Sequence, residues 1–291
     1  MRYSLLAVMP LAQRDDVLCA PIPRFHTGDS IEETAMCSDK YTVETVSSIH
    51  AWTPKLFSLR TTRSPAFRFK AGQFARIGVR KGEKIVWRAY SMVSASYDDY
   101  LEFFSIAVPG GEFTSELAKI QVGAALLVDK TAFGFLTLDR FQTGKDLWLL
   151  ATGTGVAPFL SMLQEPELWQ QYENVVLVYS VRTADELVYQ EKIDALRQHP
   201  MFGAQAARAL HYVPVVTRAP SEGALTRRIT TLIEDGGLEA AVGLKIDPAR
   251  ARLMLCGNPQ MVSDTRQILQ SRGLSLSRLS APGHLALEQF W

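Results

Sequence analysis

The chain has 291 residues, of which 47% are hydrophobic and 21% charged, a composition that indicates a folded protein with room for two ordinary domains. Its 31 basic and 30 acidic residues leave a net charge of +1, which argues against a bulk binder of nucleic acid or of membrane surfaces. Three cysteines without paired spacing favour neither a disulfide framework nor a metal or iron–sulfur site.

Residues 1–38 carry no motif and no periodic pattern, so we treat them as an appendage, either disordered or the product of a non-native start, with Met36 as a second candidate start. The apolar run 5–12 follows Arg2 as in a signal peptide, but Pro10 interrupts it and no convincing cleavage site follows. No apolar run nears the ~20 residues of a membrane span. We therefore expect a cytoplasmic protein that contacts no membrane.

Residues 39–139 are expected to form the first domain, a small antiparallel β-barrel. Short alternating segments between turn residues predict six strands. These segments are 41–47, 56–60, 74–79, 85–91, 101–108 and 125–129. Pro109-Gly110-Gly111 introduces one predicted helix near 114–120, whose free N–H groups suit a phosphate.

Residues 140–291 are expected to form the second domain, after a polar linker at 137–145. Apolar strands alternate with helical patterns, which predicts an α/β domain with a doubly wound parallel sheet. The expected strands are 147–151, 174–181, 210–216 and 252–256. The first expected helix follows the strand 147–151 and ends at 164, and the other expected helices cover 185–198, 226–235 and 261–272.

Arg88-Ala89-Tyr90-Ser91 ends the fourth expected strand and offers a cation, a flat ring and a hydroxyl. A flavin dinucleotide needs a charge for its diphosphate, a π surface for its ring and a hydrogen-bond partner near its reactive nitrogen. Strand alternation sends Arg88 and Tyr90 to one face and Ser91 to the other. In isolation such a run is more often an ordinary edge strand with a surface cation, so the flavin interpretation depends on the motifs downstream.

Gly153-Thr154-Gly155-Val156-Ala157-Pro158 follows the strand 147–151 directly. Glycines at this junction let the backbone approach a ligand, and Pro158 suits the first turn of a helix whose N-terminus faces a pyrophosphate. The alternative is a tight strand-to-helix turn without a ligand. Its position after the first motif favours a nucleotide site.

Together with Cys256-Gly257-Asn258-Pro259-Gln260-Met261, these motifs resemble those of the ferredoxin–NADP reductase family, and the aromatic C-terminus resembles its bacterial branch. The resemblance covers residues 41–291 and implies a flavin barrel joined to an NADP-binding domain, with FAD and NADP(H) as cofactors. It also implies that Tyr90 stacks on the isoalloxazine, that the Ser91 hydroxyl lies near N5, and that Cys256 closes the nicotinamide pocket. A buried strand-end thiol is the alternative for Cys256, and the two roles are compatible.

The same resemblance assigns a further set of residues to FAD. They follow the Arg-Ala-Tyr-Ser run, cover the next strand and the start of the short helix, and include one residue of the second domain. The full set is Arg88, Ala89, Tyr90, Ser91, Ser105, Ile106, Ala107, Val108, Glu112, Phe113, Thr114 and Thr154.

Preference for NADP over NAD depends on one extra phosphate, which guanidinium groups bind well. Arg218 follows a strand and Arg228 opens a predicted helix, so both cations can converge at one mouth. The resemblance places Arg218 and Arg228 on the 2′-phosphate and Arg182 on the nucleotide, whereas we expect Arg227 to be solvated. The remaining residues assigned to the cofactors in this domain are Gly155, Val181, Thr217, Cys256, Gly257, Asn258 and Gln260.

The chain ends on Leu287-Glu288-Gln289-Phe290-Trp291, and such bulky residues at a terminus suggest that something anchors them. In the resembling branch Phe290 and Trp291 pack on FAD, while Glu288 either carries protons or orients the nicotinamide. The sequence departs from the plant-type branch, whose chains end on a tyrosine that shields the flavin ring. Simple hydrophobic anchoring of the tail is the alternative.

We therefore expect an FAD enzyme, a monomer, that passes electrons between NADPH and ferredoxin or flavodoxin. One rival is an NAD(P)H-dependent reductase component for an oxygenase or cytochrome, a class that often carries a fused iron–sulfur domain whose cysteines are absent here. A second rival is a non-catalytic nucleotide-sensing protein on the same scaffold. Such a protein would be expected to have lost Tyr90 or Ser91, and both are present.

Overall fold

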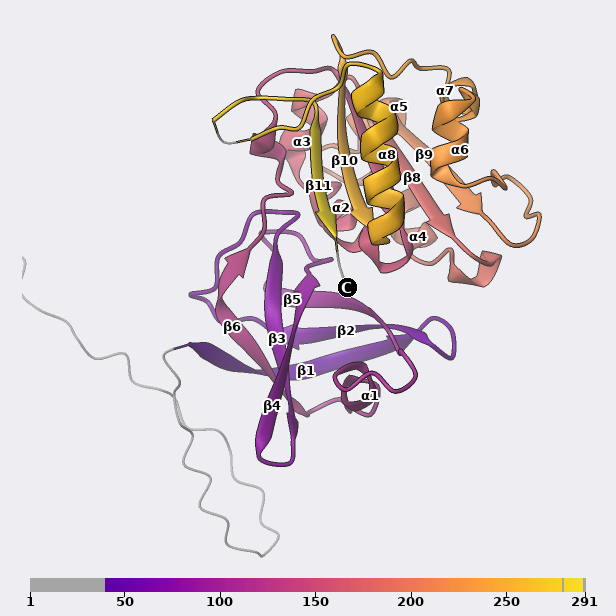
Figure 1. Cartoon of the computed structure of the whole chain (residues 1–291). Helices are drawn as coiled ribbons and strands as arrows, with labels where there is room; N and C mark the ends of the chain where they lie inside the picture. The colour runs from indigo at the N-terminus through magenta and orange to yellow at the C-terminus, as the bar shows by residue number, and fades with distance from the viewer. Residues whose placement is uncertain (1–39, 279, 290–291) are drawn as a thin grey trace, which may run out of the picture. The chain divides into compact units, whose positions relative to one another are not determined.

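The computed structural model of the protein describes residues 40–278 and 280–289, which build two β-sheets that follow one another along the chain (Figure 1). The expected appendage, with Met36, and the aromatic residues Phe290 and Trp291 lie outside the described residues. None of the helices in the described part of the chain is long and apolar enough to cross a membrane.

The first sheet has six antiparallel strands in the order β4-β3-β6-β1-β2-β5. The residue after β4, Met92, forms a bridge with Phe103 of β5, at the other end of that order, so the sheet closes into the predicted barrel. Alternate residues of β3, such as Ala75 and Ile77, are buried in the barrel core, as the period-2 pattern requires. The strands are β1 (Tyr41–Ala51), β2 (Leu56–Thr62), β3 (Phe74–Lys81), β4 (Lys84–Ser91), β5 (Tyr100–Ile106) and β6 (Ala125–Phe133).

One short helix, α1 (Thr114–Leu117), belongs to the barrel and is shorter than the predicted 114–120. The chain beyond it continues in tighter turns, because the Lys119 N–H binds the Glu116 carbonyl at 3.1 Å and the Ile120 N–H binds the Leu117 carbonyl at 3.2 Å. The expected position of the helix is therefore confirmed, and its last turn is not α-helical.

The second sheet has five parallel strands in the order β11-β10-β7-β8-β9. Four of them were expected, whereas the edge strand β11 pairs with β10 from Leu253–Leu285 to Gly257–Gln289 and was predicted only as an anchored tail. The strands are β7 (Asp146–Thr152), β8 (Asn174–Val181), β9 (Leu210–Val216), β10 (Ala251–Gly257) and β11 (Leu285–Gln289).

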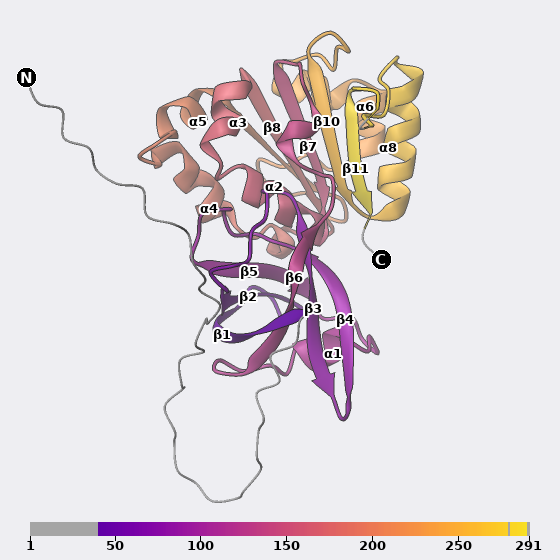
Figure 2. The same cartoon turned by 90° about the vertical axis from the view of Figure 1, so that its left-hand side faces the viewer.

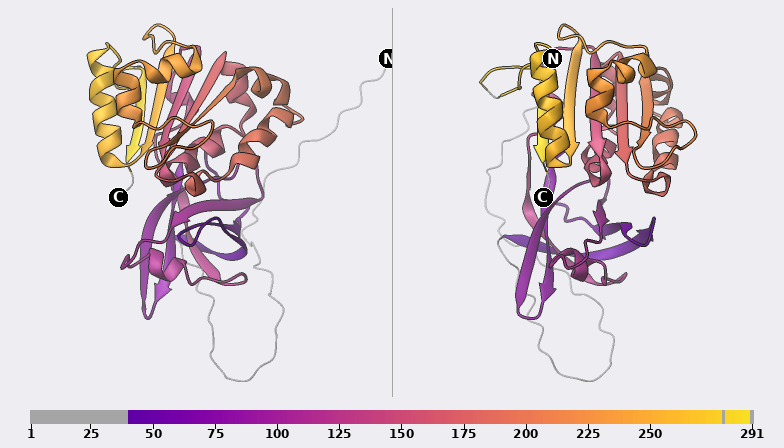
Figure 3. Two further views of the ribbon diagram at one scale, coloured as in Figure 1. Left: turned by 90° about the vertical axis from the view of Figure 1, so that its right-hand side faces the viewer. Right: turned by 45° about the vertical axis from the view of Figure 1, so that its right-hand side comes forward.

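Helices cover both faces of this sheet, which confirms the doubly wound fold. Leu147 and Leu149 of β7 pack in one apolar cluster with residues of α2, whereas Trp148 and Leu150 pack in another with residues of α6 and α8. Figures 2 and 3 show α2 to α5 on one face and α6 and α8 on the other. The helices are α2 (Ala157–Met162), α3 (Pro166–Gln171), α4 (Gln190–Ala195), α5 (Gly203–Ala209), α6 (Ile229–Glu234), α7 (Gly237–Val242) and α8 (Pro259–Ser271). The 3₁₀ turns are η1 (Leu138–Arg140), η2 (Gly153–Val156), η3 (Ala184–Glu186) and η4 (Leu196–Gln198).

Two expected helices differ from the structure in their extent. The helix expected at 185–198 is interrupted, since Tyr189 between η3 and α4 has a left-handed backbone with φ 65°. The helix expected from 226 begins only at Ile229, because Arg228 has extended backbone angles. Both differences move charged or aromatic side chains off a helix and into loops beside cavities.

Candidate functional site

A cavity of about 490 Å³ lies at the ends of β4 and β5 and contains nearly every residue predicted to contact a flavin. All four residues of the run Arg88–Ser91 line it. Strand alternation was expected to put Ser91 on the face opposite Arg88 and Tyr90, but all three line the same cavity. Ala107 does not line it, and the Ala107 N–H binds the Lys55 carbonyl at 2.8 Å. The other predicted residues in its wall are Ser105, Ile106, Val108, Glu112, Phe113, Thr114 and Thr154.

Tyr90 presents a flat ring to this cavity from a fixed position. Its hydroxyl lies 2.8 Å from the Ser105 hydroxyl, and its ring centroid lies 5.6 Å from that of Phe113. Burial raises the pKa of the Tyr90 phenol, so the group stays protonated at neutral pH. The arrangement holds an uncharged aromatic surface against the cavity, which suits stacking on another ring.

Ser91 supplies the evidence that a polar ligand fits here. Ser91 lines the cavity, its side chain is buried, and its hydroxyl oxygen has no hydrogen-bond partner among the described residues. A buried hydroxyl without a partner is unfavourable unless a ligand satisfies it. The exposed Arg88 guanidinium in the same wall uses one nitrogen on the Trp87 carbonyl, at 2.8 Å, and its remaining donors suit a diphosphate.

A second cavity, of about 380 Å³, lies at the carboxyl ends of β7, β8 and β9. This edge is where open parallel sheets bind their ligands. Thr154 and Ile106 line both cavities, so the two cavities adjoin. The predicted nucleotide residues in the wall of the second cavity are Val181, Arg182, Thr217, Arg228, Asn258 and Gln260.

Two of the predicted residues, Gly155 and Gly257, must be glycine because neighbouring atoms leave no room for a side chain. A Cβ atom at Gly155 would lie 2.5 Å from the Cys256 carbonyl oxygen, and one at Gly257 would lie 2.2 Å from the Thr152 hydroxyl. Gly257 also has φ +132°, which disfavours any side chain. Neither glycine lines the flavin cavity or the nucleotide cavity, and both allow the ends of β7 and β10 to approach each other.

The three arginines predicted to bind the nucleotide, and Arg227, which was expected to be solvated, fall into three environments. Arg182 and Arg228 line the nucleotide cavity. Arg218 is exposed and does not line this cavity. Its backbone N–H donates to the Arg182 carbonyl at 2.9 Å, so the backbones of the two residues are neighbours. Arg227, expected to be solvated, is exposed and forms an ion pair with Asp235.

Glu288 and Cys256 face each other in register on β11 and β10. One carboxylate oxygen of Glu288 is buried without a partner among the described residues, and burial raises its pKa from 4.5 to about 7. Burial and the neighbouring Glu288 carboxylate both raise the pKa of the Cys256 thiol. At neutral pH the carboxyl group is therefore close to its midpoint and can hold or release a proton, whereas the thiol stays protonated.

Several cavity residues were missed from the sequence. Phe104, Gly111, Ala157 and Gln289 join the flavin cavity, and the nucleotide cavity gains Leu56, Thr152, Gly153, Tyr179, Ser180, Glu186, Ile229, Thr230, Met261 and Asp264. Thr152 and Ser180 stand at strand ends, where polar residues are a usable signal. Phe104 lies inside an apolar strand and carried no signal beyond core packing.

Comparisons with known proteins agree with the two-domain fold. The family model for an oxidoreductase FAD-binding domain matches residues 42–132, and that for an oxidoreductase NAD-binding domain matches residues 149–267. A ferredoxin–NADP reductase A of Sorangium cellulosum is 44% identical over 253 residues, which cover 86% of this chain and 90% of the relative. A flavodoxin/ferredoxin–NADP reductase of Rhodobacter capsulatus is 37% identical over 249 residues, which cover 84% and 92%.

A solved structure gives the same result. A ferredoxin NADP⁺ reductase from Neisseria gonorrhoeae, crystallised with bound FAD and NADP, aligns with a TM-score of 0.81 and 40% sequence identity. The alignment covers 87% of this chain and all of that one.

Proposed function

This chain belongs to the ferredoxin–NADP reductase family, and we propose that it passes electrons between NADPH and a ferredoxin through FAD bound at Tyr90 and Ser91. It is an oxidoreductase with an FAD-binding and an NAD-binding domain. The observation that carries the proposal is the junction of the two cavities at Thr154 and Ile106, because a hydride donor and its acceptor must meet.

When bound, FAD accepts a hydride as an electron pair and releases the electrons one at a time, which no side chain can do. The residues of the chain bind and orient. Tyr90 holds the flavin ring, the Ser91 hydroxyl donates to it, and Arg88 neutralises the diphosphate. Glu288, with a pKa of about 7, holds the proton that the reaction takes up or releases, and the buried Cys256 lies beside it on β10 with its thiol protonated.

The nucleotide preference is for NADP(H). Arg182 and Arg228 bring two guanidinium groups to the cavity wall for the phosphates of the nucleotide, and Arg218 lies next to Arg182 along the backbone but outside that wall. Asn258 acts indirectly, since its side chain accepts the N–H groups of Gln260 and Met261 and so fixes the start of α8.

The finer assignments complete the proposal. The domains divide at 139 and 140, between the stretches matched by the two family models. The protein is a cytoplasmic monomer. Flavodoxin is a second acceptor, because the Rhodobacter capsulatus relative is named for both carriers.

The test starts with the visible spectrum of the purified protein, which should be that of a flavoprotein. NADPH added without oxygen should bleach the spectrum, and cytochrome c should then be reduced only when ferredoxin or flavodoxin is added. Direct reduction of a cytochrome or of an oxygenase component, without either carrier, would favour the first rival. A protein that binds NADPH without any bleaching would be a nucleotide sensor.

A further inference from the structure

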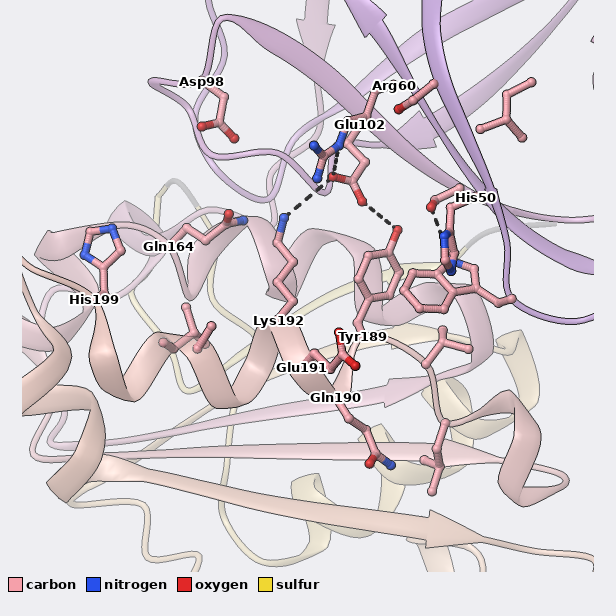
Figure 4. Close-up of a pocket in the computed structure, with 18 of the residues that line it drawn as sticks. His50, Arg60, Asp98, Glu102, Gln164, Tyr189, Gln190, Glu191, Lys192 and His199 are labelled. Atoms are coloured by element: carbon pink, nitrogen blue, oxygen red, sulfur yellow. Dashed lines mark hydrogen bonds and ion pairs between the residues drawn. The ribbon is translucent and has the colours of Figure 1, made fainter. Parts of the chain in front are cut away.

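A third cavity, of about 1060 Å³ and therefore larger than the two already described, lies between β1, β2 and β5 of the barrel and α4 of the second domain (Figure 4). Its wall contains the carboxylate of Glu102, which is 3% exposed. A buried carboxylate is unfavourable unless charges and donors surround it. The partners of Glu102 therefore indicate what this cavity is for.

Both oxygens of Glu102 are engaged by protein groups. The Arg60 Nε donates to Oε2 at 3.0 Å, and the Lys192 ammonium lies 3.6 Å from the same oxygen. The Tyr189 hydroxyl donates to Oε1 at 2.9 Å. Arg60 belongs to the barrel, but Lys192 and Tyr189 belong to the second domain, so the carboxylate is fully satisfied only when the domains are joined as in Figure 4.

Tyr189 is inserted from the second domain into a socket of the barrel. Its side chain is 4% exposed, and its ring lies 4.7 Å from Trp52 and edge-on to Phe104 at 5.3 Å. Among the described residues it is the one non-glycine residue with positive φ. A left-handed backbone is unfavourable for a residue with a Cβ atom and persists where surrounding contacts require it.

Glu102 and Tyr189 each belong to a chain segment that also lines one of the two cofactor cavities. In the barrel, the strand β5 carries both Glu102 and Phe104, and Phe104 lines the flavin cavity. On the other side, Tyr189 ends a turn that begins at Arg182, whose N–H donates to the Glu186 carboxylate at 2.9 Å. Arg182 and Glu186 line the nucleotide cavity.

We propose that Tyr189 is a positioning residue, whose bond to Glu102 fixes the nucleotide-binding turn relative to the flavin-binding strand. This inference rests on the proposed function, because it concerns the alignment of the two cofactors. Misplacement of reacting groups by ~1 Å can slow a reaction by about a hundredfold. The bond contributes to the rate of hydride transfer and not to the affinity for either cofactor.

The deciding variant is Tyr189→Phe, which keeps the ring in its socket and removes only the hydroxyl. We expect single-turnover reduction of the flavin by NADPH to slow by about tenfold, because a partial loss of alignment costs less than a full displacement. We expect the affinities for FAD and for adenosine 2′,5′-bisphosphate to stay unchanged. The matched control is Tyr172→Phe, since Tyr172 is also buried and its hydroxyl accepts a bond from Gln171, within the second domain, at 3.2 Å.

Glu102→Gln supplies the second arm of the test. If the bond is the cause, the double variant Glu102→Gln/Tyr189→Phe should reduce the flavin no more slowly than the slower single variant. A wild-type rate in Tyr189→Phe, or losses that multiply in the double variant, would overturn the proposal. Equal losses of rate and of nucleotide affinity would overturn it as well, because they would show that the bond is needed to form the nucleotide site and not to align it with the flavin site.

A readout in the flavin-free protein separates this proposal from the proposed function. Hydrogen exchange of the turn 182–189 should be faster in Tyr189→Phe than in wild type and Tyr172→Phe. If wild-type protein reconstituted with FAD is not reduced by NADPH, the proposed function fails, whereas unchanged exchange in Tyr189→Phe counts against the link itself.

Discussion

Glu288→Gln should abolish a specific loss of stability that the wild-type protein undergoes between acidic and alkaline pH. Burial raises the pKa of Glu288 in the folded protein to about 7, compared with 4.5 for an ordinary glutamate. The folded state therefore binds the proton more tightly than the unfolded state does. Below 4.5 both states are protonated, and this contribution to stability is fully present.

As the pH rises from 4.5 to 7, the unfolded chain releases its proton first, so the free energy of unfolding decreases with pH. Above 7 the folded state carries a buried carboxylate and the loss is complete. The difference between the two pKa values corresponds to about 3 kcal/mol. The glutamine variant has no proton to release, so it should not show this loss.

The assay is urea unfolding of the flavin-free protein at about pH 5 and about pH 8, with wild type and Glu288→Gln compared at each pH. Subtracting the variant from the wild type removes the contributions of titrating groups that do not interact with Glu288. The Cys256 thiol does interact with Glu288, but burial raises its pKa, so it stays protonated in the folded protein at both pH values. The exposed Glu222→Gln is the control and should remain parallel to wild type. A difference between wild type and Glu288→Gln that is the same at both pH values would refute the argument.

Three further predictions concern the two cavities and the glycine contact beside the second. Tyr90→Ala should weaken FAD binding about two- to tenfold, because the stacking of aromatic rings contributes roughly 0.5 to 1.5 kcal/mol beyond burial, and an unchanged dissociation constant would remove Tyr90 from the flavin face. Arg228→Ala should raise the Michaelis constant for NADPH about ten- to a hundredfold and leave that for NADH unchanged, while Arg227→Ala should affect neither. Gly257→Ala should lower the free energy of unfolding by about 2 kcal/mol or more, measured in urea, whereas Gly223→Ala, which has open space for a Cβ, should cost less; equal costs would show that contact with the end of β7 is unimportant.

Local signals in the sequence were sufficient to predict the two domains and most of the flavin cavity. The run from Arg88 to Ser91 combines a cation, an aromatic ring and a hydroxyl within four residues, and in the structure all four residues line the cavity. The strand β11 was not predicted, because Leu285-Ala286-Leu287 looks like any short apolar stretch and its pairing with β10 is a long-range event. Phe104 was missed for a related reason, since an apolar residue in a strand usually belongs to the core.

The interruption of the helix expected at 185–198 could not be predicted from residues nearby. Its cause is Tyr189, and the carboxylate that accepts its hydroxyl lies 87 positions away in sequence. Helical periodicity describes the residues around Tyr189 correctly, but a tertiary bond and a socket in the other domain override it. Arg218 shows the converse limit: its place after a strand predicted that it converges with Arg228 at one mouth, but of the two only Arg228 lines the cavity.

The placement of Tyr189 in the barrel also affects how this enzyme could be rebuilt from parts. A chimaera that joins this barrel to the nucleotide domain of a relative, cut at the linker, would bring a foreign side chain to the socket formed by Trp52 and Phe104. A graft that changes cofactor preference by exchanging only the residues around Arg228 leaves that socket intact. Loop exchange is therefore the better route to an NADH-dependent version of this protein than domain exchange.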